Sequence, residues 1–572
     1  MSAPGPDGFY HPSSEAELAD LVRSASERGL QLRVRGAAHS ISHAIYTDPL
    51  AGWPNSINEQ SPPPGPNIDV MLDRYRGWRV RDESRKLVEA DAGIHMGEDR
   101  TNPENASLTT SLLWQLWNDK GWALSNLGGI TRQTVSGFTA TGSSGGSVKY
   151  SVNDNLWGFR VIDSNGNVHE VTREDADPGP FLAMAPNLGL LGVVSKIIFE
   201  CVDTFNIAGQ EAITTVEDCE IDLFGPGTAE KPSLEAFLRD AEYARVEWWP
   251  QRGAERVQVW QAQRIRPQLG FHRRTYEEFT DEPRTQVAIS LIYTFLSNLD
   301  DLSQAKPQIA RTFARAEKLL ETSSPLEKLG PLGWALANVL AFAGKLATDA
   351  LIDLLKPLAG TIERKLPCIF PFLLSFFVSL DSQKRGTAKG EPQAFQDEAW
   401  HGLPMDNESD DDLLPIAFTE AWVPLGRTKQ VMLLLREYFT SPADVHESYR
   451  RTGLFAWELY AAKPTPFWMS ASHEQDEEWR DGVFRIDPFW FAGTPVDPSE
   501  TFYLQFWELL RDNDIPFRLH WGKYQPAPDA GAGGWVAYFR SQYPRWNDFL
   551  ALRAERDPHG TFLTSYWRER IK

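Results

Sequence analysis

The N-terminal stretch of the chain carries two hydrophobic periods in succession. Residues 14–27 open with a Ser-x-x-Glu pattern, and their apolar side chains then recur every third or fourth position until Gly29. Serine with glutamate three residues later is typical of a helix capping box, and this spacing places the apolar residues on one helical face. Residues 30–35 instead alternate apolar and polar side chains, which is the period of a half-buried strand. A helix followed directly by a strand is therefore predicted.

Further strands are predicted along the chain. Residues 86–90 and 158–163 have strand-like apolar patterns, and Ser-Asn-Gly-Asn at 164–167 supplies turn residues after the second of these. Beyond residue 205 the composition shifts from Gly-rich turns to Trp-rich, strand-like stretches such as 245–249. This shift predicts a domain boundary near residue 205.

Residues 300–410 follow a different pattern. An apolar run carries one narrow polar stripe, and a second uncharged stretch, 366–380, is interrupted by Pro367 and Pro371. The stripe consists of Lys345, Asp349 and Asp353. Both runs are shorter than the roughly 18 apolar residues that a membrane-spanning helix needs. We therefore expect a buried helical insert, with an interfacial membrane contact or a dimer face as the second interpretation. The charged residues 382–413 are expected to form a mobile surface loop.

Composition narrows the class of protein. The chain has 572 residues, which at about 150 residues per domain predicts two to four domains. Its formal net charge of −21 disfavours nucleic acid as a partner, because the phosphates would be repelled. Three scattered cysteines are too few for a disulfide framework or a thiolate metal site. The first residues lack the basic and apolar regions of a signal peptide, so a cytoplasmic protein without a bound metal is expected.

Three Gly-rich segments are the strongest candidates for ligand binding. Residues 33–40 run from a strand into a turn of small residues whose backbone amides can approach a diphosphate, with His39 at the mouth of the turn. A structural loop with a partly exposed histidine is the alternative. Residues 126–147 concentrate glycine and hydroxyl side chains, and apolar residues interrupt them, so a ligand-binding loop is favoured over a flexible linker. Residues 187–194 form a third turn, which leads into a strand.

The order and spacing of these segments resemble the flavin-binding domain of the vanillyl-alcohol oxidase superfamily. The closest similarity is to the branch of sugar-lactone and alditol oxidases, which includes gulonolactone, galactonolactone and arabinonolactone oxidases. Leu-His-Trp-Gly-Lys at 519–523 resembles that branch's His-Trp-Gly/Ala-Lys motif, and residues 557–562 resemble its closing Asp-Pro-x-x-x-Phe. The resemblance covers residues 9–205 and 415–572, and the long insert is similar to that of covalent-flavin cholesterol oxidase.

The resemblance implies an α+β fold with a two-lobed PCMH-type FAD-binding domain and a substrate-binding cap domain, the latter with an antiparallel sheet and a helical insert. Residues 1–205 would form the N-terminal part of the FAD-binding domain. Residues 206–520 would form the cap, with the insert at about 300–410, and residues 521–572 would return to the FAD-binding domain. No Gly-x-Gly-x-x-Gly fingerprint follows a predicted strand, so the doubly wound dinucleotide-binding fold is not expected.

FAD is the cofactor that the resemblance implies. His39 stands where the superfamily often joins the flavin covalently through its 8α-methyl group, and the alternative is a histidine that neighbours the ring without a covalent bond. The positions that match the cofactor-binding motifs are Arg35, Gly36, Ala37, Ala38, His39, Ser40, Ser136, Gly137, Thr141, Gly142, Ser143, Gly145, Gly146, Gly192 and Val193. Two of them depart from the pattern: Ala38 replaces a second glycine, and Gly146 stands where alditol oxidases have a serine.

Catalytic roles follow from the same resemblance and from the chemistry of alcohol oxidation. Lys523 would place an ammonium beside the negative charge that a reduced flavin acquires. Glu458 and His520 are the candidates to take the alcohol proton, with a strand ion pair and a structural histidine as the alternatives. Tyr460 replaces the arginine of a Glu-x-Arg pair that contacts substrate in alditol oxidases; here its phenol would donate a hydrogen bond or narrow the pocket. Two further carboxylates are interpreted as structural, Glu247 and Glu420.

The sequence therefore predicts an FAD-dependent oxidase or dehydrogenase. Its substrate would be an alcohol, polyol or sugar lactone, oxidised at a CH–OH group by hydride transfer to flavin N5, with O2 or another acceptor taking the electrons. The alternative is a natural-product oxidase acting on a bulky aromatic or lipophilic substrate, which Tyr460 and the insert would suit. A non-catalytic flavin carrier is a further rival, and Lys523 in its motif speaks against it.

Overall fold

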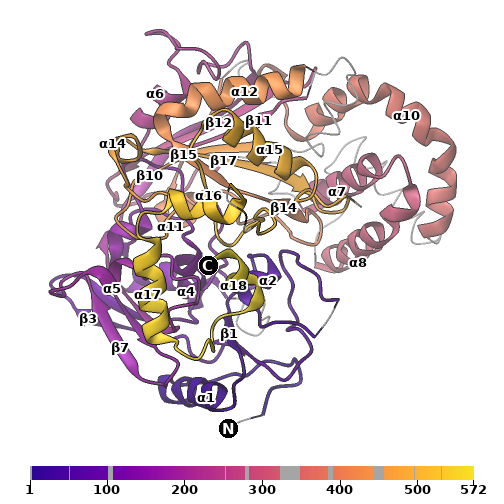
Figure 1. Ribbon diagram of the computed structural model, residues 1–572. Helices are drawn as coiled ribbons and strands as arrows, with labels where there is room; N and C mark the ends of the chain where they lie inside the picture. Colours follow the sequence, from indigo (N-terminus) through magenta and orange to yellow (C-terminus); the bar gives the residue numbers. More distant parts are fainter. Residues whose placement is uncertain are drawn as a thin grey trace.

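The computed structural model describes residues 3–50, 52–100, 107–251, 253–276, 278, 283–322, 348–383, 391–441, 456–494, 496–529, 531 and 533–571. The chain up to residue 203 forms an N-terminal part below one large sheet, and a group of helices lies to one side of that sheet (Figure 1). The C-terminal helices run back onto the N-terminal part. The predicted α+β fold class is confirmed.

The N-terminal part begins with the helix and strand that the sequence predicts. Helix α1 (Glu15–Glu27) is capped by Ser14, whose side chain accepts a hydrogen bond from the amide of Glu17. Strand β1 (Leu32–Arg35) follows and pairs in parallel with β2 (Ile68–Met71). The predicted helix and strand are both confirmed. Each prediction depends on neighbouring residues in the sequence rather than on distant contacts.

A five-stranded antiparallel sheet completes the N-terminal part, in the order β3-β4-β8-β6-β7. Its strands are β3 (Trp78–Asp82), β4 (Leu87–Asp91), β6 (Leu156–Ile162), β7 (Val168–Thr172) and β8 (Val193–Glu200). The shorter elements around it are α2 (Ser42–Ile45), α3 (Leu112–Gln115), β5 (Trp122–Ala123), α4 (Val135–Thr141), α5 (Gly179–Leu182) and β9 (Val202–Asp203). The strands predicted at 86–90 and 158–163 are confirmed as β4 and β6, and Gly166 takes a φ of 80° in the turn between β6 and β7.

The large sheet has nine strands, in the order β13-β10-β12-β11-β16-β17-β15-β18, with β14 pairing with β17 beside this path. Every pairing in it is antiparallel. Its strands are β10 (Asn206–Thr215), β11 (Tyr243–Trp249), β12 (Arg256–Ile265), β13 (Gln393–Glu398), β14 (Ile416–Phe418), β15 (Ala421–Pro424), β16 (Trp457–Ala462), β17 (Val483–Phe491) and β18 (Arg518–Leu519).

The two faces of the large sheet have different neighbours. Helices cover the face away from the N-terminal part (Figure 1), among them α6 (Leu234–Asp240), α12 (Thr428–Thr440) and α15 (Phe502–Asp512). Trp248 and Trp457 pack under them, with ring centroids 6.1 and 5.4 Å from that of Phe439. Successive residues of a strand point to opposite faces, so Glu247 and Glu458 point toward the N-terminal part. Seven tryptophans are among the largest fully buried side chains, so much of the tryptophan surplus fills the core.

The described part of the insert is helical, as predicted. It consists of α7 (Pro283–Ser297), α8 (Lys306–Thr322) and α10 (Thr348–Phe377). Helix α10 continues through Pro367 and Pro371, where the sequence predicts an interruption. Its apolar side chains at intervals of four, Leu366, Phe370 and Leu374, are buried, and this packing offsets the lost N–H donors. None of the helices in the described ranges is both long and apolar enough to cross a membrane. Lys345 and the uncharged run at residues 331–344 before it lie outside the described residues.

The mobile surface loop predicted over residues 382–413 is wrong for the part that the structure describes. Residues 393–398 form the edge strand β13, and the short helix α11 (Ala399–Gly402) follows it. Residues 403–413 then cross toward the N-terminal part, with Leu403 and Leu413 buried. The charges that suggested a solvated loop are paired instead: Arg315 contacts Asp410 at 2.7 Å.

The C-terminal segment completes the N-terminal part. It contains α16 (Trp535–Gln542), α17 (Trp546–Arg556) and α18 (Ser565–Arg570), with the short helix α14 (Glu477–Arg480) earlier in the chain. The amide of Leu32 donates to the carbonyl of Thr561 at 2.8 Å, and the indole of Trp567 donates to the carbonyl of Ala44 at 2.9 Å. Strand β1 and the residues after it are therefore held by the end of the chain.

Candidate active site

A cavity lies between the large sheet and the turn that follows β1. Eight residues predicted from the sequence line it: His39, Ser143, Gly145, Gly146, Glu458, Tyr460, His520 and Lys523. They come from four separate stretches of the chain. The structure thus brings the expected catalytic residues and part of the expected cofactor-binding set to one place.

Two rows of side chains cross the large sheet beside this cavity. In the register of β11, β16 and β17, Glu247 lies opposite Glu458 and Glu458 lies opposite Asp487. Glu420 continues this acidic row in the register of β15 with β17. The second row lies two residues away along each strand and consists of Arg245, Tyr460, Arg485 and Trp422. Because residues two apart on a strand share a face, the two rows lie side by side.

Arg485 forms a cluster with two buried carboxyl groups. Its guanidinium contacts Glu420 at 2.7 Å and Asp487 at 3.3 Å, and it donates to the carbonyl of Ser144 at 2.8 Å. Burial opposes the ionisation of Glu420, but the positive charges around it, Arg485 foremost, together hold the pKa of that carboxyl below its ordinary value. Burial and the charge of Glu420 raise the pKa of Asp487 well above its ordinary value. Lys523 adds a second positive charge that acts on both carboxylates. We name Arg485, Lys523, Glu420 and Asp487 the Arg485 cluster.

Arg245 forms a cluster with four carboxyl groups, whose pKa values burial raises above the ordinary value. Its guanidinium nitrogens lie 2.5 Å from Glu278, 2.7 Å from Asp406, and 3.7 Å from both Glu247 and Glu458. Burial would lower the pKa of Arg245, but these carboxylates, Glu278 and Asp406 foremost, raise it well above its ordinary value. We name these five residues the Arg245 cluster. It holds one certain positive charge against four carboxyl groups.

Glu458 is the least satisfied member of the Arg245 cluster. The residue is 3% exposed, and its Oε1 accepts no hydrogen bond from the residues that the structure describes. Burial first, and then the charge of Asp406, raises its pKa well above the ordinary value. Such a carboxyl is protonated over a wider pH range than an ordinary one, and its ionised form is a stronger base. Glu458 thus differs from a strand carboxylate that a tight ion pair keeps ionised.

The Leu-His-Trp-Gly-Lys motif places two basic side chains at the cavity. The ammonium of Lys523 donates to the backbone carbonyl of His39 at 2.9 Å and lies 3.9 Å from the ring centroid of Phe418. Burial lowers the pKa of Lys523 to about 8, so it is mostly charged at neutral pH. Burial also lowers the pKa of His520 to about 4, and its Nδ1 accepts from the amide of Gly522 at 3.1 Å. His520 is thus a neutral, oriented side chain and a weaker base than Glu458.

The turn at residues 36–40 has the form of an anion-binding cradle. Ala38 takes a φ of 62°, and Ala37 and Ala38 are buried. Within the described residues, the amides of residues 37–40 donate to no backbone or side-chain acceptor. A Cβ on Gly36 would lie 2.7 Å from the hydroxyl of Thr134, so the turn packs closely on the start of α4. Consecutive unpaired amides around a left-handed residue suit a phosphate group.

His39 stands at the opening of this turn, where the cavity meets a second one. Arg35 and Ala37 line this second cavity, and His39 lines both. Burial, and then the charge of Lys523, lowers the pKa of His39 to about 3. The imidazole is therefore neutral and half-buried beside the cradle.

Several predicted cofactor residues do not line the first cavity. The hydroxyl of Ser136 donates to the carbonyl of Ala92 at 2.8 Å, and that of Thr141 donates to Gly137 within α4. These hydroxyls stabilise turns and helix, which is a structural role that the sequence did not indicate. Seven more predicted cofactor residues also do not line the first cavity: Gly36, Ala38, Ser40, Gly137, Gly142, Gly192 and Val193. A Cβ on Gly192 would lie 2.4 Å from the carbonyl of Ile162, so its packing against β6 requires glycine.

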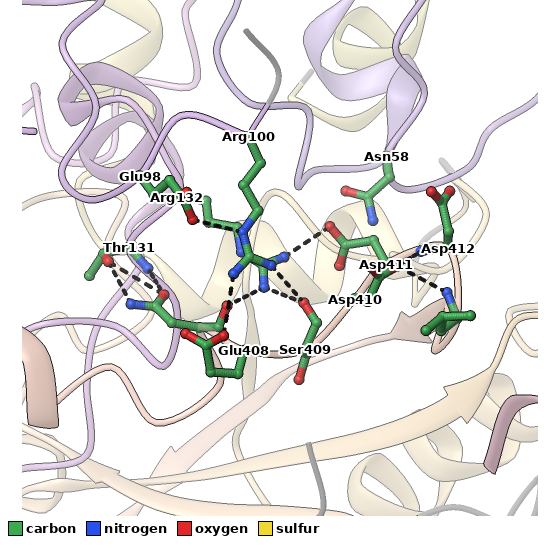
Figure 2. Close-up of polar contacts among 12 residues, drawn as sticks. Asn58, Glu98, Arg100, Thr131, Arg132, Glu408, Ser409, Asp410, Asp411 and Asp412 are labelled. Atoms are coloured by element: carbon green, nitrogen blue, oxygen red, sulfur yellow. Dashed lines mark hydrogen bonds and ion pairs between the residues drawn. The ribbon is translucent and has the colours of Figure 1, made fainter. Parts of the chain in front are cut away.

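A segment at residues 405–412 ties the N-terminal part to the cavity (Figure 2). The guanidinium of Arg132 donates to the carbonyls of Asn407 and Ser409 and contacts Asp411 at 3.2 Å. The amide of Asp406 donates to the carbonyl of Gly129 at 2.8 Å. These contacts hold Asp406 against Arg245, although the two residues belong to different stretches of the chain.

The structure adds functional candidates that the sequence interpretation missed, namely Arg245, Asp406, Arg485 and Asp487. Glu247 and Glu420, interpreted as structural, also line the cavity. One signal was present in the sequence: each central strand carries charged or aromatic side chains two residues apart, as in Arg-x-Glu at 245–247 and Arg-x-Asp at 485–487. Buried strands with polar residues on one face are unusual unless that face lines a site.

Comparisons with known proteins connect this site to a family. Residues 461–570 match the family ALO, described as D-arabinono-1,4-lactone oxidase. The chain is 25% identical over 246 residues to L-gulonolactone oxidase of Mus musculus, covering 43% of this chain and 46% of that protein. It is 22% identical over 272 residues to D-arabinono-1,4-lactone oxidase of Kluyveromyces lactis, covering 47% and 44%. The match to L-gulono-1,4-lactone dehydrogenase of Mycobacterium tuberculosis is 27% over 205 residues, covering 35% and 39%. The chain thus spans less than half the length of these curated relatives.

Solved structures match over nearly the whole chain. Cholesterol oxidase from B. sterolicum has a TM-score of 0.60 at 14% identity, covering 98% of this chain and 93% of that one. A solvent-stable cholesterol oxidase has a TM-score of 0.61 at 15% identity, covering 100% and 97%. At these identities the likeness establishes the fold. The resemblance drawn from the motifs, to this flavin-binding superfamily and its sugar-lactone branch, is confirmed.

Proposed function

We propose that this chain is an FAD-dependent oxidoreductase that oxidises a CH–OH group of an alcohol, polyol or sugar lactone. The observation that supports this most directly is Lys523, which lies in the stretch matching the lactone oxidase family and shares one cavity with His39 and Glu458. The relatives are named for sugar-lactone oxidation. The buried acidic row supplies proton-accepting groups on the opposite wall of the same cavity.

The residues present fit FAD. The unpaired amides of residues 37–40 suit its diphosphate, and the position of His39 at the opening of that turn suits a neighbour of the ring system. FAD, when bound, supplies the hydride acceptor for the alcohol. The remaining chemistry belongs to the side chains of this chain.

Glu458 is proposed as the group that accepts the alcohol proton. It faces the cavity, it has an unsatisfied oxygen, and its raised pKa makes the ionised form strongly basic. Lys523 is proposed as the fixed positive charge that stabilises negative charge developing in the cavity, at a pH below its pKa of about 8. His520 is proposed to orient its neighbours as a neutral imidazole.

Finer features are proposed from the sequence. Attachment of FAD through His39 follows from the superfamily position, and the neutral imidazole is the form that attachment needs. O2 as electron acceptor, a cytoplasmic location and domain boundaries at residues 205 and 520 rest on the sequence interpretation. The two-part arrangement of the chain is compatible with those boundaries.

A bulkier substrate is the second candidate, and a specific observation favours it. One wall of the cavity is apolar, with Leu414, Ile416, Phe418 and Phe489 beside the insert. Together with Tyr460 in place of a charged side chain, this wall suits an aromatic or lipophilic alcohol. A screen of alditols, lactones, sterols and aromatic alcohols distinguishes the two candidates.

The visible absorption spectrum of the purified chain tests the proposal first. We expect a flavin spectrum, and after acid precipitation we expect the colour in the pellet if His39 holds the flavin covalently. In the His39→Ala variant the colour should then move to the supernatant. A wild-type preparation that is colourless and takes up no added FAD would overturn the proposed function.

A further inference from the structure

The hydrogen-bond donors of the second row differ in what they already bind. The guanidinium of Arg245 donates to two carboxyl groups of its cluster, at 2.5 and 2.7 Å. That of Arg485 donates to a carboxyl oxygen at 3.0 Å and to a backbone carbonyl at 2.8 Å. Tyr460 lies between the two arginines, and its hydroxyl forms no hydrogen bond with the described residues. Trp422, the fourth member of the row, does not line the cavity. Tyr460 is therefore the donor of this row that remains available to a ligand.

The hydroxyl of Tyr460 is open to the cavity although the residue is buried. Tyr460 is 4% exposed, and it lines the cavity. The hydroxyl of Tyr566 also lacks a partner among the described residues, but the protein encloses that oxygen completely. The oxygen of Tyr460 is not one of these enclosed atoms, so part of the small exposed surface of this residue belongs to its hydroxyl. Such a group completes its hydrogen bonding only with a ligand or with water.

Packing fixes the ring of Tyr460 on two sides. The guanidinium carbon of Arg485 lies 4.7 Å from the ring centroid, which is the geometry of a cation–π contact. Gly146 lies against the edge of the ring, because a Cβ on this glycine would be 2.9 Å from Cδ1 of Tyr460. Gly146 and Tyr460, the two departures from the alditol oxidase pattern, are thus neighbours in the structure. A ring held in this way presents its hydroxyl to the cavity in one position.

The hydroxyl of Tyr460 and the carboxyl group of Glu458 can act on one ligand oxygen. Glu458 precedes Tyr460 by two residues in β16, so both side chains lie on the same face of the sheet, and both line the cavity. Burial, and then the charge of Glu458, raises the pKa of Tyr460 well above its ordinary value. The phenol therefore keeps its proton at neutral pH and acts as a donor. An alcohol oxygen between the two side chains accepts from Tyr460 and donates its own proton to the ionised form of Glu458.

We propose that Tyr460 is a catalytic residue whose hydroxyl donates a hydrogen bond to the oxygen of the CH–OH group that is oxidised. This inference rests on the proposed function, since it concerns the same reaction. In that reaction the O–H proton passes to Glu458, the C–H hydrogen leaves with its electron pair to the flavin, and the C=O bond forms. Tyr460 keeps its own proton, and its hydrogen bond stabilises the negative charge that the oxygen gains while the O–H bond breaks.

Two substitutions distinguish a hydrogen-bond donor from a side chain that only narrows the cavity. Tyr460→Phe removes the hydroxyl and keeps the ring, whereas Tyr460→Leu removes both. Anaerobic flavin reduction is measured in the FAD-loaded full chain with each alditol, lactone, sterol and aromatic alcohol of the screen. We expect every alcohol that reduces the wild type to reduce Tyr460→Phe at least about tenfold more slowly, which corresponds to about 1.4 kcal/mol. Tyr460→Leu should lower the rate at least as much.

Tyr538→Phe is the matched control. The hydroxyl of Tyr538 accepts a hydrogen bond from the amide of Phe517 at 3.0 Å, and Tyr538 does not line the cavity. Removing that hydroxyl should leave the rate of flavin reduction unchanged. The affinity for FAD and the urea midpoint of Tyr460→Phe should equal those of the wild type, because the Tyr460 hydroxyl binds none of the described residues.

Two results would overturn the inference and leave the proposed function standing. The first is a wild-type rate in Tyr460→Phe, which with a changed rate in Tyr460→Leu would assign the residue to the shape of the cavity. The second is a slower Tyr460→Phe enzyme that has lost FAD affinity or stability in proportion. A wild-type chain that binds FAD but that no alcohol of the screen reduces contradicts the proposed function itself, and the inference with it.

Discussion

The two arginine clusters lie on one face of one sheet, yet they are built for different purposes. Arg245 and Arg485 occupy equivalent places in the second row, on either side of Tyr460, and both are at least nine-tenths buried. Arg485 meets two carboxyl groups and has Lys523 nearby, whereas Arg245 meets four carboxyl groups. A buried carboxyl group stays ionised only where positive charge compensates it, and otherwise it holds its proton.

The difference also appears in the titration of the carboxyl groups. Arg485 keeps the pKa of Glu420 below its ordinary value, although burial opposes this. In the Arg245 cluster burial prevails and raises the pKa of Glu247 and of Glu458. Asp487 of the Arg485 cluster also has a raised pKa, because of burial and the charge of Glu420, so Glu420 is the carboxyl group that this cluster holds ionised.

The largest expected effect concerns the proton acceptor of the Arg245 cluster. Glu458→Gln should lower the rate of flavin reduction by about 10²–10⁴-fold, the usual contribution of a general base. Anaerobic stopped-flow absorbance with a substrate found in the screen measures this rate. Glu437→Gln, on the exposed face of α12, is the matched control. A Glu458→Gln enzyme with the wild-type rate would show that the base lies elsewhere.

The next effect concerns the Arg485 cluster and is one of stability. Arg485→Met leaves Glu420 and Asp487 buried without their guanidinium, so the free energy of unfolding should fall by about 3–5 kcal/mol. Urea unfolding measures it. Arg427 pairs with Glu478 at 2.5 Å, but both side chains are more than a third exposed. Arg427→Met should therefore cost less than about 1 kcal/mol. Equal losses in the two variants would contradict the structural role of the Arg485 cluster.

The charge of Lys523 should affect how the rate of flavin reduction depends on pH. Its pKa of about 8 means that the ammonium is present below that pH and is lost above it. We expect the rate of flavin reduction to fall by about tenfold per pH unit above this value, and Lys523→Arg should remove the decline because arginine stays charged. The partly exposed Lys463 gives the control Lys463→Arg, whose profile should match the wild type. A decline that persists unchanged in Lys523→Arg would assign it to another group.

The smallest expected effect concerns how the free energy of unfolding changes with pH. The sign of this change should differ between Glu420 and Glu458. The lowered pKa of Glu420 stabilises the native state above the ordinary carboxyl pKa, and this stability is lost as pH falls through the folded-state pKa. The raised pKa of Glu458 acts in the opposite direction, so stability falls as pH rises from the ordinary value toward the folded-state pKa. Each slope is at most about 1.4 kcal/mol per pH unit.

Unfolding curves of the FAD-free chain at several pH values measure these slopes. Glu420→Gln should destabilise the chain most at neutral pH, and Glu458→Gln should reduce the fall in stability toward higher pH, to which the other carboxyls with raised pKa values also contribute. Slopes of the same sign in both variants would mean that the two clusters do not differ in their proton balance.

The sequence predicts those features that depend on neighbouring residues. Helix α1 and strands β1, β4 and β6 follow from capping and periodicity, and the motifs at residues 33–40 and 519–523 identify one end of the cavity. The acidic row was missed because it depends on the register of four strands from distant parts of the chain. Glu247 becomes a site residue only because β11 pairs with β16.

Long-range packing also explains the predictions that were wrong. The charges of residues 382–413 suggested solvent, and the partners that bury them, such as Arg132 and Arg315, come from other segments. The prolines of α10 suggested an interruption, and packing of one apolar face holds the helix together. In each case the local signal was correct for an isolated segment, and the tertiary context changed its outcome.

Residues 522–561 stabilise the turn at residues 36–40, and this affects when the turn can form during synthesis on the ribosome. Lys523 donates to the carbonyl of His39, the amide of Ile41 donates to the carbonyl of Gly522, and the amide of Leu32 donates to Thr561. The cradle at residues 36–40 is translated well before residues 522–561, which support it. A nascent chain can therefore complete this turn only after those later residues have been translated, so any group that binds the turn meets it with its supports in place.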